Sequence, residues 1–285
     1  MNIFIALLPA LFWGVLPVVV TRAGGKPIQQ IIGTTAGTFL VSLIFLGIYH
    51  PHISATAFLF SFISGAFWAF GQINQYKAFA VIGVSRAMPI STGLQLASTS
   101  LLGVLAFGEW PATVTRYIGL LAVTIIIVGI ILTTWQQKKN QTPVNIKKGL
   151  SILLISTIGY LGFSAFPRMA GVSGWEAFMP QAVGMFSAAL IMASLSRQTP
   201  LMRPATARNL LSGVIFAFAA FSYLISAQRN GIATGFTLSQ MNVVIATLLS
   251  IWLLGERKTP KEMAYVVTGL LFVAGGGVMI GLLSA

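Results

Sequence analysis

Amide, hydroxyl and aromatic side chains recur along one apolar stretch of the chain, residues 64–109. Residues spaced three and four apart lie on the same face of an α-helix. The stretch predicts two apolar helices joined by a short turn at Gly83–Ser85. The face of the first helix holds Gly65, Trp68, Gln72, Gln75 and Phe79, and that of the second holds Ser91, Gln95, Ser98, Thr99 and Leu102.

These two polar stripes need partners, because a Gln side chain without one at membrane depth costs several kcal/mol on the strictest transfer scales. Such groups therefore point into protein or into a wet cavity. Uncharged amides and hydroxyls beside a Trp are suited to binding a neutral, hydroxyl-rich solute. The alternative interpretation is that they only join helices to one another.

The composition places these helices in a membrane. The 285 residues are 56% hydrophobic and 7% charged, with a mean hydropathy of +0.88. A soluble domain of this size could not hide so much apolar surface. The net charge of +13 does not indicate nucleic-acid binding, because the basic residues stand between apolar runs, the pattern that orients membrane helices. The chain has no cysteine, which excludes a disulfide, a thiolate metal site and a cysteine nucleophile.

Ten apolar runs predict an all-α membrane protein with ten transmembrane helices. They cover residues 3–21, 28–48, 56–80, 85–107, 113–135, 149–167, 177–196, 207–228, 232–254 and 262–283. The lysine-rich segment 136–148 divides them into residues 1–135 and 149–285, with five runs each. Odd-numbered connections hold 14 Lys and Arg, and even-numbered ones hold 3. The positive-inside rule then places this linker in the cytoplasm and both termini outside the cell membrane.

The two halves resemble each other in sequence. SGAFWAF at 64–70 matches SGVIFAF at 212–218, and the pair Gln30 and Gly33 matches Gln181 and Gly184. Further matches are Gly83 with Gly231, Thr92 and Gln95 with Thr237 and Gln240, Glu109 with Glu256, and Pro17 with Pro167. Because each half holds an odd number of spans, the copies are expected to be inverted. Many secondary transporters are built this way, with the solute near the midplane between the repeats.

The four acids are predicted to lie at helix ends. Glu109 and Glu256 precede a following helix, whose N-terminus favours negative charge, and Thr259-x-x-Glu262 predicts a capping box. Glu176 has no such role in the sequence and is the single candidate for a titrating carboxylate that couples protons. We expect Pro17 and Pro167, each near a Gly, to allow gating bends.

The sequence gives little support for catalysis, ATP-driven transport or metal binding. No Walker loop, HExxH motif or nucleophile with a partner base is present, so we expect neither an enzyme nor a cofactor, and no ATP-driven transport by this chain alone. His50 and His52 flank a proline without a third metal ligand, so we expect a turn. Lys77 and Arg86 are expected to snorkel to the membrane interface. Gly275–Gly277 allows close packing within the monomer or in an oligomer.

Several motifs resemble those of bacterial glucose/ribose uptake proteins, a family of the drug/metabolite transporter superfamily. They are FWGVLP in the first run, GQINQ at 71–75, GVSRAMPISTGLQL at 83–96, FGEW at 107–110 and PQAVG at 180–184. The resemblance implies import of a monosaccharide, with a proton as coupling ion, through a cavity lined by spans one, three, four, six, eight and nine. The predicted sugar-binding residues are Trp13, Trp68, Gln72, Asn74, Gln75, Thr92, Gln95, Tyr160, Gln240 and Asn242.

Two other functions remain open. A chain with this ten-span repeat could export amino acids or other small metabolites, or it could be a membrane sensor that transports nothing. The sequence leaves the sugar, the coupling residue and the oligomeric state undecided.

Overall fold

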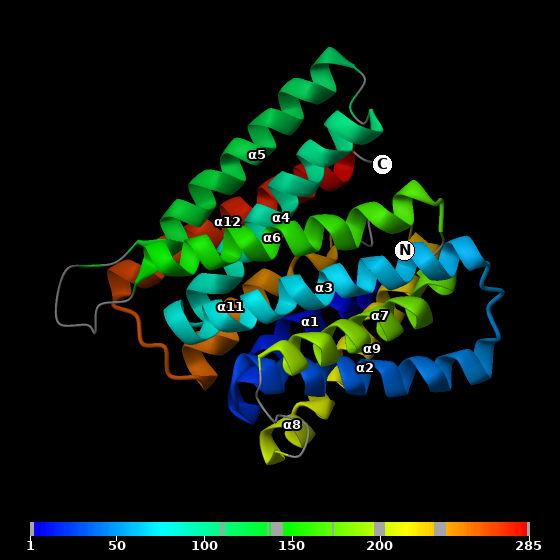
Figure 1. Ribbon diagram of the computed structural model, residues 1–285. Coiled ribbons are helices and arrows are strands. Elements are labelled where there is room, and N and C mark those ends of the chain that lie inside the picture. Colours follow the sequence, from blue (N-terminus) through cyan, green and yellow to red (C-terminus); the bar gives the residue numbers. More distant parts are fainter. Residues whose placement is uncertain are drawn as a thin grey trace. The chain divides into compact units, whose positions relative to one another are not determined.

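The computed structural model describes residues 3–108, 110, 112–135, 137, 145–172, 174–196, 203–230 and 238–283. These residues are helical almost throughout, as the apolar runs predict. The helices are α1 (Ile3–Ala23), α2 (Pro27–Tyr49), α3 (Ala55–Ile82), α4 (Val84–Phe107), α5 (Thr113–Thr134), α6 (Ile146–Met169), α7 (Gly174–Leu195), α8 (Pro204–Arg208), α9 (Leu210–Asn230), α11 (Asn242–Leu253) and α12 (Pro260–Leu283) (Figure 1). Glu109, Gly231, Thr237 and the lysines at 138 and 139 lie outside the described residues.

Eight helical segments of the described chain are long and apolar enough to cross a membrane. Two shorter apolar helices, Leu7–Ala23 and Asn242–Leu253, fall on the first and ninth predicted runs. Each predicted run therefore overlaps a helix. Many large apolar side chains on these helices are exposed, including Leu105, Trp252 and Leu282. Such exposure is expected of surfaces that face lipid and not water.

The helices group into two compact units. Unit 1 comprises Met1–Val18, Ala78–Leu154 and Ala219–Ala285, and unit 2 comprises Val19–Lys77 and Ile155–Phe218. Each unit draws segments from both halves of the sequence, and α1, α3, α6 and α9 contribute residues to both units.

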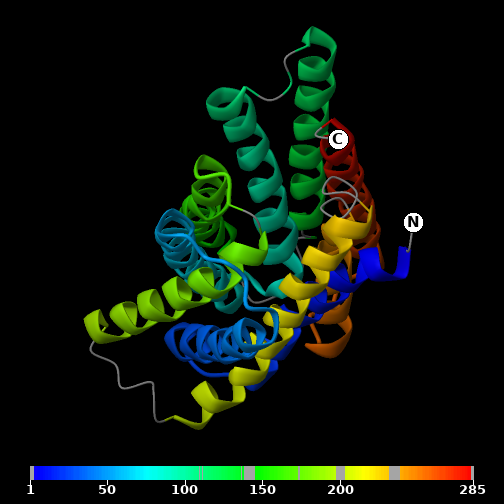
Figure 2. The same ribbon diagram turned by 90° about the vertical axis from the view of Figure 1, so that its right-hand side faces the viewer.

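In unit 1, α12 packs along α5, and α4 packs against α5, α11 and α12 (Figure 2). Gly129 and Gly269 bring α5 and α12 together, since a Cβ on either glycine would press on the backbone of the other helix. Gly276 packs against Ile126 of α5, so this part of the glycine run serves packing within the monomer. The apolar core around Leu96, Trp110 and Ile126 fixes the position of α4.

In unit 2, α2 packs against α7 and α8. Two close crossings hold this unit together. Gly65 of α3 meets the Gln181 backbone of α7, and Gly213 of α9 meets the Thr34 backbone of α2. Close approach of backbones through small residues is the usual way in which membrane helices pack. These crossings set the positions of the polar residues on α2 and α3.

Helix ends differ from the predicted bounds in two informative places. The run 207–228 is broken at Asn209 into α8 and α9, because the buried Asn209 amide donates to the carbonyls of Ala205 and Gly24. The seventh helix begins at Gly174, so Glu176 lies in its first turn, where a carboxylate is favoured. His50 takes a left-handed conformation as the C-cap of α2, as expected for a turn.

Candidate functional site

The polar stripe of α3 is buried, as its spacing predicts. Gly65, Trp68, Gln72 and Gln75 all belong to the buried part of the helix. Ser64, on the neighbouring position, donates to the carbonyl of Phe163 on α6 and accepts from the side chain of Gln181 on α7. The stripe thus faces protein within unit 2.

Gln72, Gln75 and Tyr160 form one hydrogen-bonded cluster between α3 and α6. Gln72 Nε2 donates to Gln75 Oε1 at 2.8 Å. Tyr160 Oη lies 2.8 Å from Gln72 Oε1 and 3.1 Å from Gln75 Oε1. All three side chains are at least nine-tenths buried. We call these three residues the amide–tyrosine cluster.

Small residues permit this cluster to form. Gly71 of α3 and Gly159 of α6 lie at the point where the two helices come into contact, and a Cβ on Gly159 would press on the Gly71 backbone. Ser156 strengthens the contact, since its hydroxyl donates to the Gly71 carbonyl at 2.7 Å. The two backbones therefore come close one turn before Gln75 and directly beside Tyr160, so the amides of α3 reach the hydroxyl of α6.

The cluster can exchange hydrogen-bond partners at little cost. A tyrosine hydroxyl has one proton, so Tyr160 can satisfy one of its two carbonyl acceptors at a time. An incoming hydroxyl can donate to the other carbonyl while Tyr160 keeps the first. An amide oxygen can accept two hydrogen bonds, so the direct bonds between the three side chains do not exclude a hydroxyl group of a solute. The three groups are uncharged, which suits a neutral ligand.

A second polar pair and an aromatic pair lie in the same unit. Tyr76 Oη is 3.1 Å from Thr34 Oγ1 of α2, and the sequence analysis did not single out Thr34. Trp68 lies against Phe216 with ring centroids 4.5 Å apart. Aromatic rings beside hydrogen-bonding groups can accept the C–H face of a ring-shaped solute while the polar groups bind its edge.

The remaining predicted residues lie outside this cluster. On α3, Asn74 donates to the Phe70 carbonyl and accepts from Lys77. In unit 1, Trp13 lies 5.9 Å from the Tyr223 ring, and Gln95 donates to Ser91 Oγ at 3.0 Å. The others in unit 1 are the buried Thr92, Gln240, which donates to Ser239 Oγ, and Asn242, which donates to the Ser239 carbonyl. Pro17 and Pro167 lie inside α1 and α6, and Glu176 lies in the first turn of α7.

Glu256 departs from the sequence prediction. It was expected to favour the N-terminus of the helix that follows it, but its carboxylate accepts hydrogen bonds from the backbone N–H groups of Val84 (2.7 Å) and Ser85 (3.0 Å) and from the Ser85 hydroxyl. It therefore caps α4, a helix 171 residues earlier in the chain. Gly83 makes room for this, since its φ is +78° and a Cβ there would lie 2.7 Å from the carboxylate.

The predicted capping box at α12 is confirmed. Thr259 N–H donates to Glu262 Oε2 at 2.9 Å, and Glu262 N–H donates to Thr259 Oγ1 at 3.2 Å. Glu262 also accepts from the backbone of Gln137. Arg86 is buried, with only 7% of its surface exposed. Its extension to the membrane interface stays a prediction. Within the described part of the chain, no group of three or more His, Cys, Asp or Glu side chains is placed to hold a metal ion.

Comparison with known proteins extends over nearly the whole chain. A family model described as "Sugar transport protein" matches residues 4–283. A putative sugar uptake protein of Listeria monocytogenes is 47% identical over 283 residues, covering 99% of both chains. The glucose uptake protein GlcU of Bacillus subtilis is 43% identical, covering 99% of this chain and 98% of its own. A putative ribose uptake protein RbsU of Lactobacillus johnsonii is 45% identical, covering 97% of both.

A solved crystal structure shares the fold of this chain. It superposes with a TM-score of 0.61 at 15% sequence identity, covering 99% of this chain and 96% of its own. At that identity the likeness concerns the fold alone.

Proposed function

Because this chain belongs to the sugar transport protein family, we propose that it imports a neutral monosaccharide, of the glucose or ribose kind, and that the amide–tyrosine cluster binds the sugar. The family makes the protein a membrane sugar transporter and not an enzyme. The observation that carries the rest is the convergence of two amides and a phenol, all uncharged and buried, between two membrane helices. The other predicted sugar contacts remain predictions; they are Trp13, Trp68, Asn74, Thr92, Gln95, Gln240 and Asn242.

Alternating access between two inverted repeats is the second part of the proposal. Three packed pairs, α2 with α7, α4 with α11 and α5 with α12, each join predicted counterparts of the two halves. In unit 2, a Cβ on Gly184 would overlap the Phe62 carbonyl, and one on Gly37 would overlap that of Leu210. Phe62 and Leu210 each stand two residues before the matching Ser-Gly pairs. Reciprocal contacts of this kind are expected when a two-fold axis relates the halves, and they support ten spans, with residues 1–135 and 149–285 as the repeats.

Counterflow in proteoliposomes tests sugar transport. We expect vesicles preloaded with unlabelled glucose or ribose to accumulate the labelled sugar transiently, because the unlabelled sugar inside competes with the entered label for outward transport on the carrier. A membrane sensor would give no flux in this assay. An exporter of amino acids would exchange labelled amino acids and ignore sugars. Either result would contradict the proposal, and liposomes without protein give the background.

Proton coupling is the third part. Among the described acids, Glu176 and Glu262 lie in first helical turns and Glu256 lies between α11 and α12, so each stands at a helix end. Glu256 and Glu262 are engaged with backbone N–H groups of helix N-termini. Glu176, the candidate that the sequence predicts, remains the carboxylate proposed to take up the proton.

Replacement of Glu176 by Gln should separate coupling from transport. Without a titrating group, an inward proton gradient can no longer drive accumulation, so the sugar should only equilibrate across the membrane. Counterflow should persist at close to the wild-type rate, since it needs no net proton movement. Accumulation that survives in Glu176→Gln and collapses with an uncoupler would show that the proton uses another residue.

A further inference from the structure

A small cavity opens in unit 1 where α3 ends and α4 begins. It has a volume of about 180 Å³. Its lining residues are Val81, Ile82, Gly83, Arg86, Glu256, Arg257 and Lys258. About 10–15 Å³ of such space holds one water, so this cavity has room for several waters or for a phosphate group.

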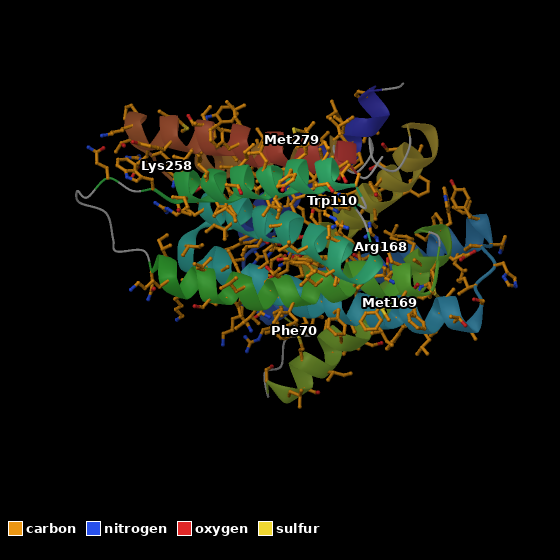
Figure 3. All side chains as sticks on the ribbon, turned by 90° about the horizontal axis from the view of Figure 1, so that it is seen from above. Phe70, Trp110, Arg168, Met169, Lys258 and Met279 are labelled. Carbon is orange, nitrogen blue, oxygen red and sulfur yellow. The ribbon has the colours of Figure 1, made fainter. Side chains whose placement is uncertain are left out.

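Three cations line this cavity together with one carboxylate. Arg86 comes from the first turn of α4, and Arg257 and Lys258 come from the segment between α11 and α12. Glu256 holds the two parts together, since it accepts hydrogen bonds from the α4 N-terminus. Figure 3 shows Lys258 near the beginning of α12, at the opposite end of that helix from Met279.

The carboxylates near the cavity do not balance its cations. Glu256 engages two backbone N–H groups and the Ser85 hydroxyl. Glu262, whose charge also acts on Arg86 and Lys258, engages the N–H groups of Gln137 and Thr259. Among the residues that the structure describes, three positive charges thus lie near two negative ones at this cavity, and both carboxylates accept hydrogen bonds at helix N-termini.

The positive charges at the cavity also repel one another. Burial, with the nearby charge of Arg86, lowers the pKa of Lys258 from 10.5 to about 8, although Glu256 and Glu262 act in the opposite direction. Two cations held close together in a partly buried place raise each other's free energy. A bound anion would remove this cost.

We propose that the cavity lined by Arg86, Arg257 and Lys258 binds a phosphate group. The guanidinium groups of Arg are suited to bidentate hydrogen bonds with phosphate oxygens, and Lys adds a compact charge. In the predicted orientation this end of unit 1 faces the cytoplasm. The bound phosphate group then has two available sources. One is a free phosphate or phosphate monoester in the cytosol, and the other is the headgroup of an anionic phospholipid. The site is separate from the amide–tyrosine cluster, which lies in unit 2.

Thermal unfolding of the full chain in nanodiscs tests the site without a transport assay. In pure phosphatidylcholine, millimolar inorganic phosphate should raise the melting temperature by about 3 °C or more, relative to sodium chloride of equal ionic strength. Lys258→Gln and Arg257→Gln should each abolish most of this shift. These two positions are preferred to Arg86, whose burial makes a folding defect the expected result of replacement.

Lys261→Gln is the matched control. Lys261 is three residues further along and lies 5.3 Å above the ring of Trp135, outside the lining of the cavity. Its replacement should keep the full phosphate-induced shift. The shift in the wild-type protein should also shrink from pH 7 to pH 9, because a bound anion favours the charged form of Lys258, whose pKa is about 8.

A second set of nanodiscs distinguishes the sources. If the site takes a lipid headgroup, about 30% phosphatidylglycerol without added phosphate should raise the melting temperature of the wild type and of Lys261→Gln, but not that of Lys258→Gln. A response to free phosphate alone assigns the site to a soluble phosphate. The proposal is overturned if neither addition stabilises the wild type, or if Lys258→Gln and Arg257→Gln respond as the wild type does.

Discussion

Replacement of Gln75 by alanine is expected to lower sugar uptake by about 30- to 150-fold, which corresponds to a loss of about 2–3 kcal/mol. The Gln75 carbonyl accepts hydrogen bonds from both Gln72 and Tyr160. Its removal takes away a contact proposed for the sugar, and it also leaves the buried Gln72 amide N–H short of an acceptor, while Tyr160 can still donate to the Gln72 carbonyl. Gln72→Ala should have an effect of similar size, because Gln72 bonds both other members of the cluster. Initial rates of labelled glucose or ribose uptake measure the loss.

Tyr160→Phe should have a smaller effect on uptake. It removes one hydroxyl and keeps the ring, so about 1 kcal/mol and a five- to tenfold loss of rate are expected. Ser164→Ala is the matched control on α6, since this hydroxyl donates only to the Leu161 carbonyl of its own helix. Its uptake rate should match that of the wild type. All variants must reach wild-type abundance in the membrane, measured by quantitative immunoblot. Unchanged uptake kinetics in Gln72→Ala and Gln75→Ala would remove the cluster from the sugar site.

The helices of this protein could be predicted from sequence because the signal is local. A run of about 20 apolar residues forms a helix in lipid, where each backbone N–H and C=O needs a partner. The burial of Trp68, Gln72 and Gln75 could also be predicted, since three- and four-residue spacing puts them on one face. The capping box at Thr259 and Glu262 lies within four residues of sequence, and it too was predicted correctly.

Contacts between distant segments could not be predicted in the same way. Glu256 caps α4 and not the helix that follows it, because packing in unit 1 brings the N-terminus of α4 to this carboxylate. The break at Asn209 depends on the carbonyl of Gly24, which lies 185 residues away in sequence. The surroundings of Arg86 are a further case, since this buried residue lines one cavity with Glu256, Arg257 and Lys258, which are distant in sequence. Nothing in the local pattern around these residues indicates which partner the fold provides.

The close crossings of unit 2 lead to the second large effect, which concerns stability. Gly65→Ala should lower the free energy of unfolding by about 3 kcal/mol or more and the melting temperature by about 6–12 °C. A Cβ at this position would overlap the backbone carbonyl of Gln181, and backbone cannot rotate away as a side chain can. α3 and α7 must then separate, which also weakens the bond from Gln181 to Ser64. Thermal unfolding of the purified protein, followed by size-exclusion chromatography, measures the change.

Gly47→Ala supplies the matched control for this substitution. Gly47 lies on α2 of the same unit, and a Cβ there would have no atom within 4 Å. Ala favours a helix over Gly, so the melting temperature should stay the same or rise slightly. Gly213→Ala should behave like Gly65→Ala, since its Cβ would overlap the Thr34 carbonyl. Equal losses at Gly65 and Gly213 are expected if the two crossings are counterparts in a pair of inverted repeats. A Gly65→Ala protein as stable as the wild type would mean that α3 and α7 do not approach so closely, and the positions of Gln72 and Gln75 would lose their support.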